Sequence, residues 1–204
     1  MSGQLDRKAD DVLVKRLQER FSRDDLSPLG GGAVSVRITD FSLRLSGLSE
    51  ELLEAVRERY HPFIDENGKE GLSVEFLEGE SSCLGPDDGY LKLEEASFPG
   101  ERVLLSNDFS GTWNEVLGRG RLFVSAGNSI RSKLTAFENY FRWLAANLLI
   151  ERGGFLFHSA GLVRNGSAYL FFGHSGAGKS TVTEFSPGAG ILSDDLVLVL
   201  PDGA

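Results

Sequence analysis

The spacing of apolar side chains changes several times along the chain. Over residues 6–21 apolar residues recur among charged ones at near-helical spacing, which predicts a short amphipathic helix. Residues 27–32 bring a proline and three successive glycines, a composition typical of a flexible linker. We therefore assign residues 1–32 to an N-terminal helix and linker. Two interpretations of this helix stay open, a docking element and a loosely attached extension.

From residue 34 onward the apolar period becomes two. The alternation over 34–38 and 41–45 predicts a strand pair or one bent strand. Ser49 begins a predicted helix that Pro62 ends, because serine caps helix N-termini and proline lacks the amide. Further strand-like segments, separated by turn-forming residues, cover 72–77, 90–93, 102–105 and 121–125. We expect residues 33–127 to form a small, mainly β, α/β N-terminal domain.

A helical period returns over residues 128–152. Seven large apolar residues form a wide stripe there, which is typical of core packing. Gly153-Gly154 predicts the end of the helix. We interpret this segment as a helix that connects the N-terminal domain to residues 153–204. The overall fold class expected is α/β, or α+β for the whole chain.

The pattern of the last fifty residues predicts strands, a tight turn and a glycine-rich loop. Segments 155–158 and 161–164 are strand-like, Asn165-Gly166 predicts a two-residue hairpin turn, and 168–172 predicts a continuous apolar strand. A phosphate-binding loop pattern, G-x-x-x-x-G-K-[ST], follows that strand directly. Its residues are Gly173, His174, Ser175, Gly176, Ala177, Gly178, Lys179 and Ser180, with Thr181 next.

Each fixed position of this loop has a chemical reason. Glycines allow positive φ, so successive amides can turn inward around a phosphate at the start of the helix predicted over 180–185. Lys179 would reach the β- and γ-phosphates, and the Ser180 hydroxyl would ligate Mg²⁺. The loop therefore predicts that the chain binds the phosphates of a nucleotide together with Mg²⁺.

A pair of aspartates follows the loop. Asp194 and Asp195 stand between two apolar runs, and burying two carboxylates there without a cation would be costly. We therefore expect them near the metal, although a solvated turn is the alternative.

The composition limits the binding partners and the cellular compartment that we expect. The 204-residue chain carries a net charge of -9 and no run of basic residues, which disfavours nucleic acid and anionic membranes. A single cysteine, Cys83, excludes an internal disulfide and suits a reducing compartment. With neither a signal peptide nor an apolar run long enough to span a bilayer, we expect a cytoplasmic protein.

Together, His158, the loop 172–181 and the run 192–195 resemble the catalytic half of bacterial HPr kinase/phosphorylase and its relatives. This resemblance implies an incomplete P-loop kinase domain with a phosphoenolpyruvate-carboxykinase-like fold. It also implies ATP-dependent transfer of the γ-phosphate to a Ser-type hydroxyl on a protein or a small molecule.

The resemblance also assigns roles. Lys179 is similar to the family's phosphate-binding lysine and Ser180 to its Mg²⁺ ligand. Asp195 resembles the carboxylate that acts as general base, with Asp194 as its substitute or as a partner of the metal. His158 resembles the histidine near the transferred phosphate, although a strand-end histidine bonded to a backbone carbonyl is the alternative. His174 contacts phosphate at most.

The sequence departs from the family after residue 200, where later strands, an acidic metal ligand and an acceptor-binding segment have no counterpart. The apolar strand predicted over 196–200 would then form an edge that favours pairing, for example in a homo-oligomer. The alternatives are therefore a piece of a longer kinase, a nucleotide-binding sensor or scaffold without efficient transfer, and an adaptor built on the N-terminal domain. A GTPase is disfavoured because no Asn-Lys-x-Asp motif is present.

Overall fold

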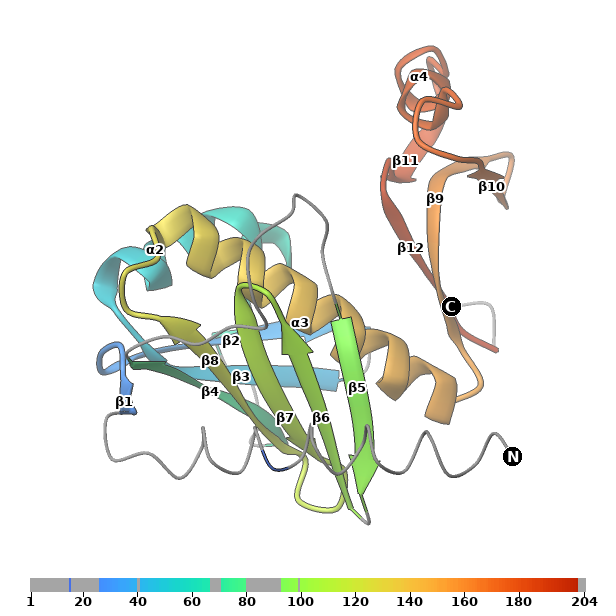
Figure 1. The fold of residues 1–204 in the computed structure, drawn as a ribbon. Helices are drawn as coiled ribbons and strands as arrows, with labels where there is room; N and C mark the ends of the chain where they lie inside the picture. The colour runs from blue at the N-terminus through green and yellow to red at the C-terminus, as the bar shows by residue number, and fades with distance from the viewer. Residues whose placement is uncertain are drawn as a thin grey trace. The chain divides into compact units, whose positions relative to one another are not determined.

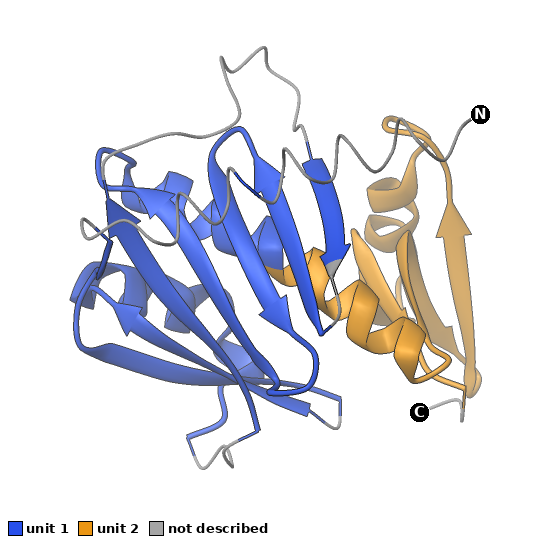
Figure 2. Ribbon diagram, turned by 60° about the horizontal axis from the view of Figure 1, so that its bottom comes forward, with its two compact units in different colours: residues 1–140 blue, residues 141–204 orange. Residues whose placement is uncertain are grey.

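The computed structural model describes residues 15, 26–39, 41–66, 71–79, 93–98 and 100–201. The chain divides into two compact units, Met1–Tyr140 and Phe141–Ala204 (Figure 2). The helix predicted over 6–21, apart from Lys15, lies outside the described residues, and so does Cys83.

Unit 1 is built on a mixed sheet whose strands run in the order β2-β3-β4-β8-β7-β6-β5 (Figure 1), with β1 paired to β4. Its strands are β1 (Ser27–Pro28), β2 (Gly32–Ile38), β3 (Phe41–Leu48), β4 (Leu72–Gly79), β5 (Leu93–Phe98), β6 (Glu101–Ser106), β7 (Phe109–Asn114) and β8 (Arg119–Ser125). Strand β4 is parallel to β3 and to β8, and every other pairing is antiparallel. The expected mixture of strands and helices is thus confirmed.

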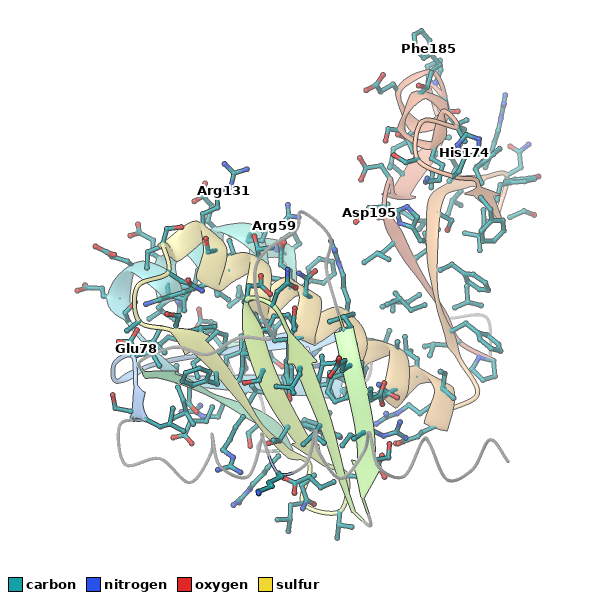
Figure 3. All side chains as sticks on the ribbon, viewed as in Figure 1. Arg59, Glu78, Arg131, His174, Phe185 and Asp195 are labelled. Atoms are coloured by element: carbon teal, nitrogen blue, oxygen red, sulfur yellow. The ribbon has the colours of Figure 1, made fainter. Side chains whose placement is uncertain are left out.

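Helices α2 (Glu50–Arg59) and α3 (Ile130–Glu151) share the core of this unit through Phe137. The Phe137 ring contacts Tyr60, at the end of α2, and Phe76 on β4, with centroids 5.5 and 5.6 Å apart. Two ion pairs flank this contact: Lys133 Nζ lies 2.7 Å from Glu78 Oε2, and Arg59 Nε lies 2.6 Å from Glu138 Oε1 (Figure 3 labels Glu78 and Arg59). Aromatic packing therefore fixes both helices on one face of the sheet.

Tyr140 occupies a slot that two glycines leave open on that face. A Cβ atom at Gly111 would overlap the Tyr140 ring, and one at Gly120 would overlap its hydroxyl. The hydroxyl donates a hydrogen bond to the Thr112 carbonyl at 2.7 Å. Complete burial raises the pKa of the phenol well above its usual value.

Several local predictions for this unit are confirmed. Strands β2 and β3 form the expected pair, and Ser49 caps α2 by accepting a hydrogen bond from the Leu52 amide at 3.3 Å. A 3₁₀ turn over His61–Phe63 holds Pro62 just after the helix, as expected.

Two strands of this unit were predicted only in part or not at all. The strand predicted over 90–93 meets the observed strand β5, Leu93–Phe98, at Leu93, and Glu94 and Glu95 of β5 are exposed. Residues 90–92 lie outside the described part of the chain. Strand β7 was missed because its sequence, FSGTWN, lacks a strong apolar alternation.

Unit 2 contains the end of α3 and a small antiparallel sheet organised around β9 (Phe155–Arg164). The sheet's other strands are β10 (Ser167–Phe172), β11 (Gly190–Ser193) and β12 (Leu196–Val199). Each of them pairs with β9, and Figure 1 shows β11 and β12 following one another along it. The two segments predicted over 155–158 and 161–164 are thus one continuous strand.

The turn after β9 adopts the predicted hairpin geometry. Asn165 and Gly166 have φ of 52° and 77°, as a two-residue turn between twisted strands requires, and Arg164 pairs with Ser167. The predicted apolar strand is present as β10, and its Tyr169 and Phe172 are more than half exposed. Strand β12 is paired along its whole length, and its Val197 side chain is buried.

Within the described part of the chain, no helix has both the length and the apolar character needed to cross a membrane.

Candidate functional site

The glycine-rich loop leaves β10 and ends in the short helix α4 (Lys179–Glu184), close to the predicted start. Gly176 and Gly178 have φ of 81° and 86°, the left-handed region in which a side chain is strained. At Gly173 the reason is space, since a Cβ atom would lie 2.6 Å from the Ala177 Cβ. All three glycines of the motif are therefore required by the shape of the loop itself.

Lys179 lies across this loop. Its Nζ donates hydrogen bonds to the carbonyl oxygens of Gly173 at 2.9 Å and His174 at 3.2 Å. The ammonium group is thus held against the loop backbone by two carbonyl oxygens, which oxygen atoms of a bound anion could replace. This geometry fits the phosphate-binding role expected for Lys179.

The other loop residues predicted to contact the nucleotide are at the surface. His174, Ser175, Ser180 and Thr181 are exposed (Figure 3 labels His174). His174 Nδ1 lies 2.7 Å from the Ser175 carbonyl oxygen, and the Ala177 amide donates to the His174 carbonyl at 3.1 Å. Internal hydrogen bonds therefore shape the loop, and the Ser180 hydroxyl is accessible to a metal ion.

His158 and Asp195 come together although 37 residues separate them (195 minus 158). Antiparallel pairing sets Leu196 opposite His158, and the Ser159 amide donates to the Asp195 carbonyl at 2.9 Å. The side chains then meet, with His158 Nδ1 2.9 Å from Asp195 Oδ1. The alternative interpretation of His158 was a ring bonded to a backbone carbonyl. In the structure, its Nδ1 atom contacts the Asp195 carboxylate instead.

Ser193 shapes the turn that presents the aspartates. Its Oγ accepts hydrogen bonds from the amides of Asp195 at 3.2 Å and Leu196 at 3.1 Å. Serine hydroxyls commonly stabilise turns in this way. The serine before the two aspartates thus has a structural role of its own.

Arg142, on α3, is a third member of this cluster that sequence analysis missed. Its Nη2 lies 3.2 Å from Asp195 Oδ2, so the two carboxylate oxygens contact different side chains. The local sequence carries no signal for this contact, because Arg142 occupies an ordinary polar position in an apolar-striped helix.

The topology brings the loop and the aspartates beside the same stretch of β9. Strands β10 and β11 are both antiparallel to β9 and hence parallel to each other. The last residue of β10, Phe172, pairs with Ser159, and the last residue of β11, Ser193, pairs with Gly161. The phosphate loop and the Asp194-Asp195 turn therefore both begin beside the stretch of β9 that follows His158.

The burial expected for the two aspartates is wrong. Asp194 is exposed, and the Asp195 side chain, labelled in Figure 3, is also accessible, with 48% of its surface exposed. Both carboxylates are open to solvent where burial against a cation was expected, and Asp195 also contacts Arg142. Among the described residues, no three His, Cys, Asp or Glu side chains form a cluster that could hold a metal by themselves.

Comparisons with protein-family models and with curated proteins identify no relative of this chain. No protein-family model matches the chain, and no curated protein matches its sequence closely enough to be taken as a relative.

Proposed function

We propose that the chain is an ATP-dependent kinase of the HPr-kinase-related type, which transfers the γ-phosphate to a Ser-type hydroxyl on a protein or a small molecule. The observation that supports this proposal is the emergence of the glycine-rich loop and of the Asp194-Asp195 turn beside the middle of β9, at Ser159 and Gly161, with His158 beside Asp195. A phosphate loop and a carboxylate that emerge beside the same stretch of one strand are parts that phosphoryl transfer needs.

In this proposal each residue has a distinct task. ATP with Mg²⁺ supplies the phosphoryl group and its charge neutralisation when bound. The backbone of the loop and the Lys179 ammonium hold phosphate oxygens, the Ser180 hydroxyl is the metal ligand, and Asp194 faces the metal's water shell. Asp195 accepts the proton of the attacking hydroxyl, and His158 orients that carboxylate through Oδ1.

The proposal also includes the kinase fold, the cellular location and the oligomeric state expected from the sequence. Residues 153–204 would belong to a phosphoenolpyruvate-carboxykinase-like kinase domain, in a cytoplasmic protein able to form homo-oligomers. The single cysteine supports a reducing compartment, and the exposed aromatic residues of β10 support burial against further protein surface.

A second candidate is a nucleotide-binding sensor or scaffold without efficient transfer. One observation favours it: both oxygens of Asp195 already have partners, His158 and Arg142, whereas a general base needs an accessible oxygen. The two candidates share the nucleotide site and differ in turnover.

Titration with a fluorescent ATP analogue, with and without Mg²⁺, tests the shared site. Lys179→Ala should weaken binding by about 1.5 to 3 kcal/mol, the range for losing a hydrogen bond to a charged group. Lys15→Ala, which removes an exposed lysine that is not part of the glycine-rich loop, is the matched control and should bind like the parent chain. Equal binding by all three proteins, or no saturation at millimolar nucleotide, would contradict the proposal.

Transfer of labelled γ-phosphate to candidate hydroxyl acceptors then separates the two candidates. With a general base at Asp195, Asp195→Asn keeps nucleotide affinity and loses transfer. If the parent chain binds nucleotide but labels no acceptor, the sensor candidate is favoured.

A further inference from the structure

A second polar site lies in unit 1, far along the sequence from the glycine-rich loop. Strand pairing sets five residues in one row across the sheet: Arg44 opposite Ser73, Ser73 opposite Arg119, Arg119 opposite Asn114, and Asn114 opposite Glu101. Paired residues of neighbouring strands project from the same face of a sheet. These five side chains therefore share one face of strands β3, β4, β8, β7 and β6, which are adjacent in Figure 1.

The next row on the same face is polar as far as Thr112, which lies opposite the buried Val103. Two residues further along the strands, Ser46 is opposite Glu75, Glu75 opposite Arg121, and Arg121 opposite Thr112. Because side chains alternate along a strand, these rows lie on the face opposite Gly111 and Gly120, which meet Tyr140 of α3. The rows line a cavity of about 560 Å³ on the side of the sheet away from the helices.

The cavity lining has three arginines against two glutamates, Glu75 and Glu101, so it is slightly positive in an acidic chain. Arg44, Arg119 and Arg121 line it, in a protein whose net charge is -9. Arg44 and Arg119 are exposed, and neither forms an ion pair with any residue of the described ranges. Their guanidinium groups are thus available to a ligand.

The placement of Arg44 and Arg119 favours one anion geometry. They flank Ser73 on its two neighbouring strands, so their Cα atoms are about 10 Å apart, two strand spacings. A planar carboxylate is saturated by one bidentate guanidinium, whereas a tetrahedral phosphate offers acceptor oxygens in several directions. Two arginines that approach from opposite sides of a serine hydroxyl therefore suit a phosphate group.

The remaining lining suits a hydroxylated organic group. Glu75, Glu101, Asn114 and Thr112 supply acceptors and donors beside the arginines, and the two carboxylates would repel a second anionic group. The volume lies within the range of small-molecule sites and exceeds what phosphate alone would fill. We propose that this cavity binds a small phosphate monoester with a hydroxyl-bearing organic part, held through its phosphate by Arg44, Ser73 and Arg119.

Calorimetric titration with glycerol 3-phosphate tests the proposal, and Lys179→Ala is used as the background so that the glycine-rich loop does not contribute. We expect saturable binding that Arg44→Gln and Arg119→Gln each weaken about tenfold or more, as expected for a lost charge-assisted hydrogen bond. Arg131→Gln is the matched control: Arg131 is an exposed arginine on α3 (Figure 3), and its removal should leave binding unchanged.

Three comparison ligands complete the test. Inorganic phosphate should bind more weakly than glycerol 3-phosphate, and glycerol should not bind at all. Succinate, a dicarboxylate, should bind at least tenfold more weakly than the phosphate ester. Equal binding of succinate, no binding of glycerol 3-phosphate, or equal losses in the Arg131→Gln and Arg119→Gln variants would each overturn the proposal.

Discussion

The Nδ1 atom of His158 lies 2.9 Å from Oδ1 of Asp195, and the main chain holds the two residues in that relation. The Ser159 amide donates to the Asp195 carbonyl, and Leu196 pairs with His158. The two side chains should therefore act as a unit, and their effects on phosphate transfer should not be additive. We expect His158→Gln and Asp195→Asn each to reduce the transfer rate, and the double variant to lose little more than Asp195→Asn alone.

A double-mutant cycle on single-turnover transfer rates measures this coupling. His174→Gln, which removes the exposed histidine of the loop, is the control and should be additive with Asp195→Asn. Additive losses for His158 and Asp195 would show that the observed contact has no part in transfer.

Arg142 is expected to matter little for stability. The Arg142 and Asp195 side chains are 43% and 48% exposed, and ion pairs between exposed groups contribute about 0 to 1 kcal/mol. Arg142→Gln should therefore change the free energy of unfolding by less than about 1 kcal/mol, as measured by urea denaturation. Its effect should appear instead in transfer, because Asp195 Oδ2 is released. A loss of several kcal/mol would mean that the helix depends on this pair.

Tyr140 should make the protein sensitive to alkaline pH. Burial raises the pKa of the folded phenol above the ordinary value of 10.0, so the folded state keeps a proton that the unfolded chain releases. This contribution to stability is fully present below pH 10 and is lost as the pH rises further, by up to about 1.4 kcal/mol per pH unit. Tyr140→Phe should cost about 1 kcal/mol at neutral pH, through loss of the hydrogen bond to Thr112, and should remove this alkaline decline.

Unfolding free energies measured from pH 7 upward, up to the limit of reversibility, test this prediction. Tyr169→Phe removes an exposed phenol and provides the comparison. An alkaline decline of equal slope in the parent chain and in Tyr140→Phe would refute it.

The slot for Tyr140 predicts intolerance of any side chain at two glycines. Gly111→Ala and Gly120→Ala each place a methyl group into the Tyr140 side chain, and overpacking of this kind typically costs about 1 to 3 kcal/mol. Gly31→Ala is the matched control, because a Cβ atom there meets no atom within 4 Å. Thermal denaturation of the three variants should show a large loss for the first two and almost none for the third.

Sequence reasoning succeeded where a few neighbouring residues determine the conformation. Asn165-Gly166 fixes a hairpin turn, and Ser49 satisfies an amide of the helix it precedes. Gly176 and Gly178 likewise adopt the positive φ that their motif implied. In each case, residues within a few positions of one another contain the physical cause.

Sequence reasoning failed where the residue that explains a feature lies far away in the chain. Strand β7 contains Gly111, whose lack of a side chain is explained by Tyr140, 29 residues later (140 minus 111). Arg142 meets Asp195 across 53 positions, through tertiary structure that no local pattern records. The exposure of Asp194 was also missed, because flanking apolar residues indicate a strand but not which of its neighbours remain in water.

Strand β9 carries a consequence for the cooperativity of unit 2. Strands β10, β11 and β12 all hydrogen-bond to β9. If the hydrogen bonds on either side of β9 break, the strands that flank the glycine-rich loop or the Asp194-Asp195 turn are therefore released. Amide groups that depend on one shared element exchange with solvent through a common opening. The amides of β9 should therefore exchange most slowly in unit 2, and a ligand that tightens the glycine-rich loop should also slow exchange at the turn that carries Asp195.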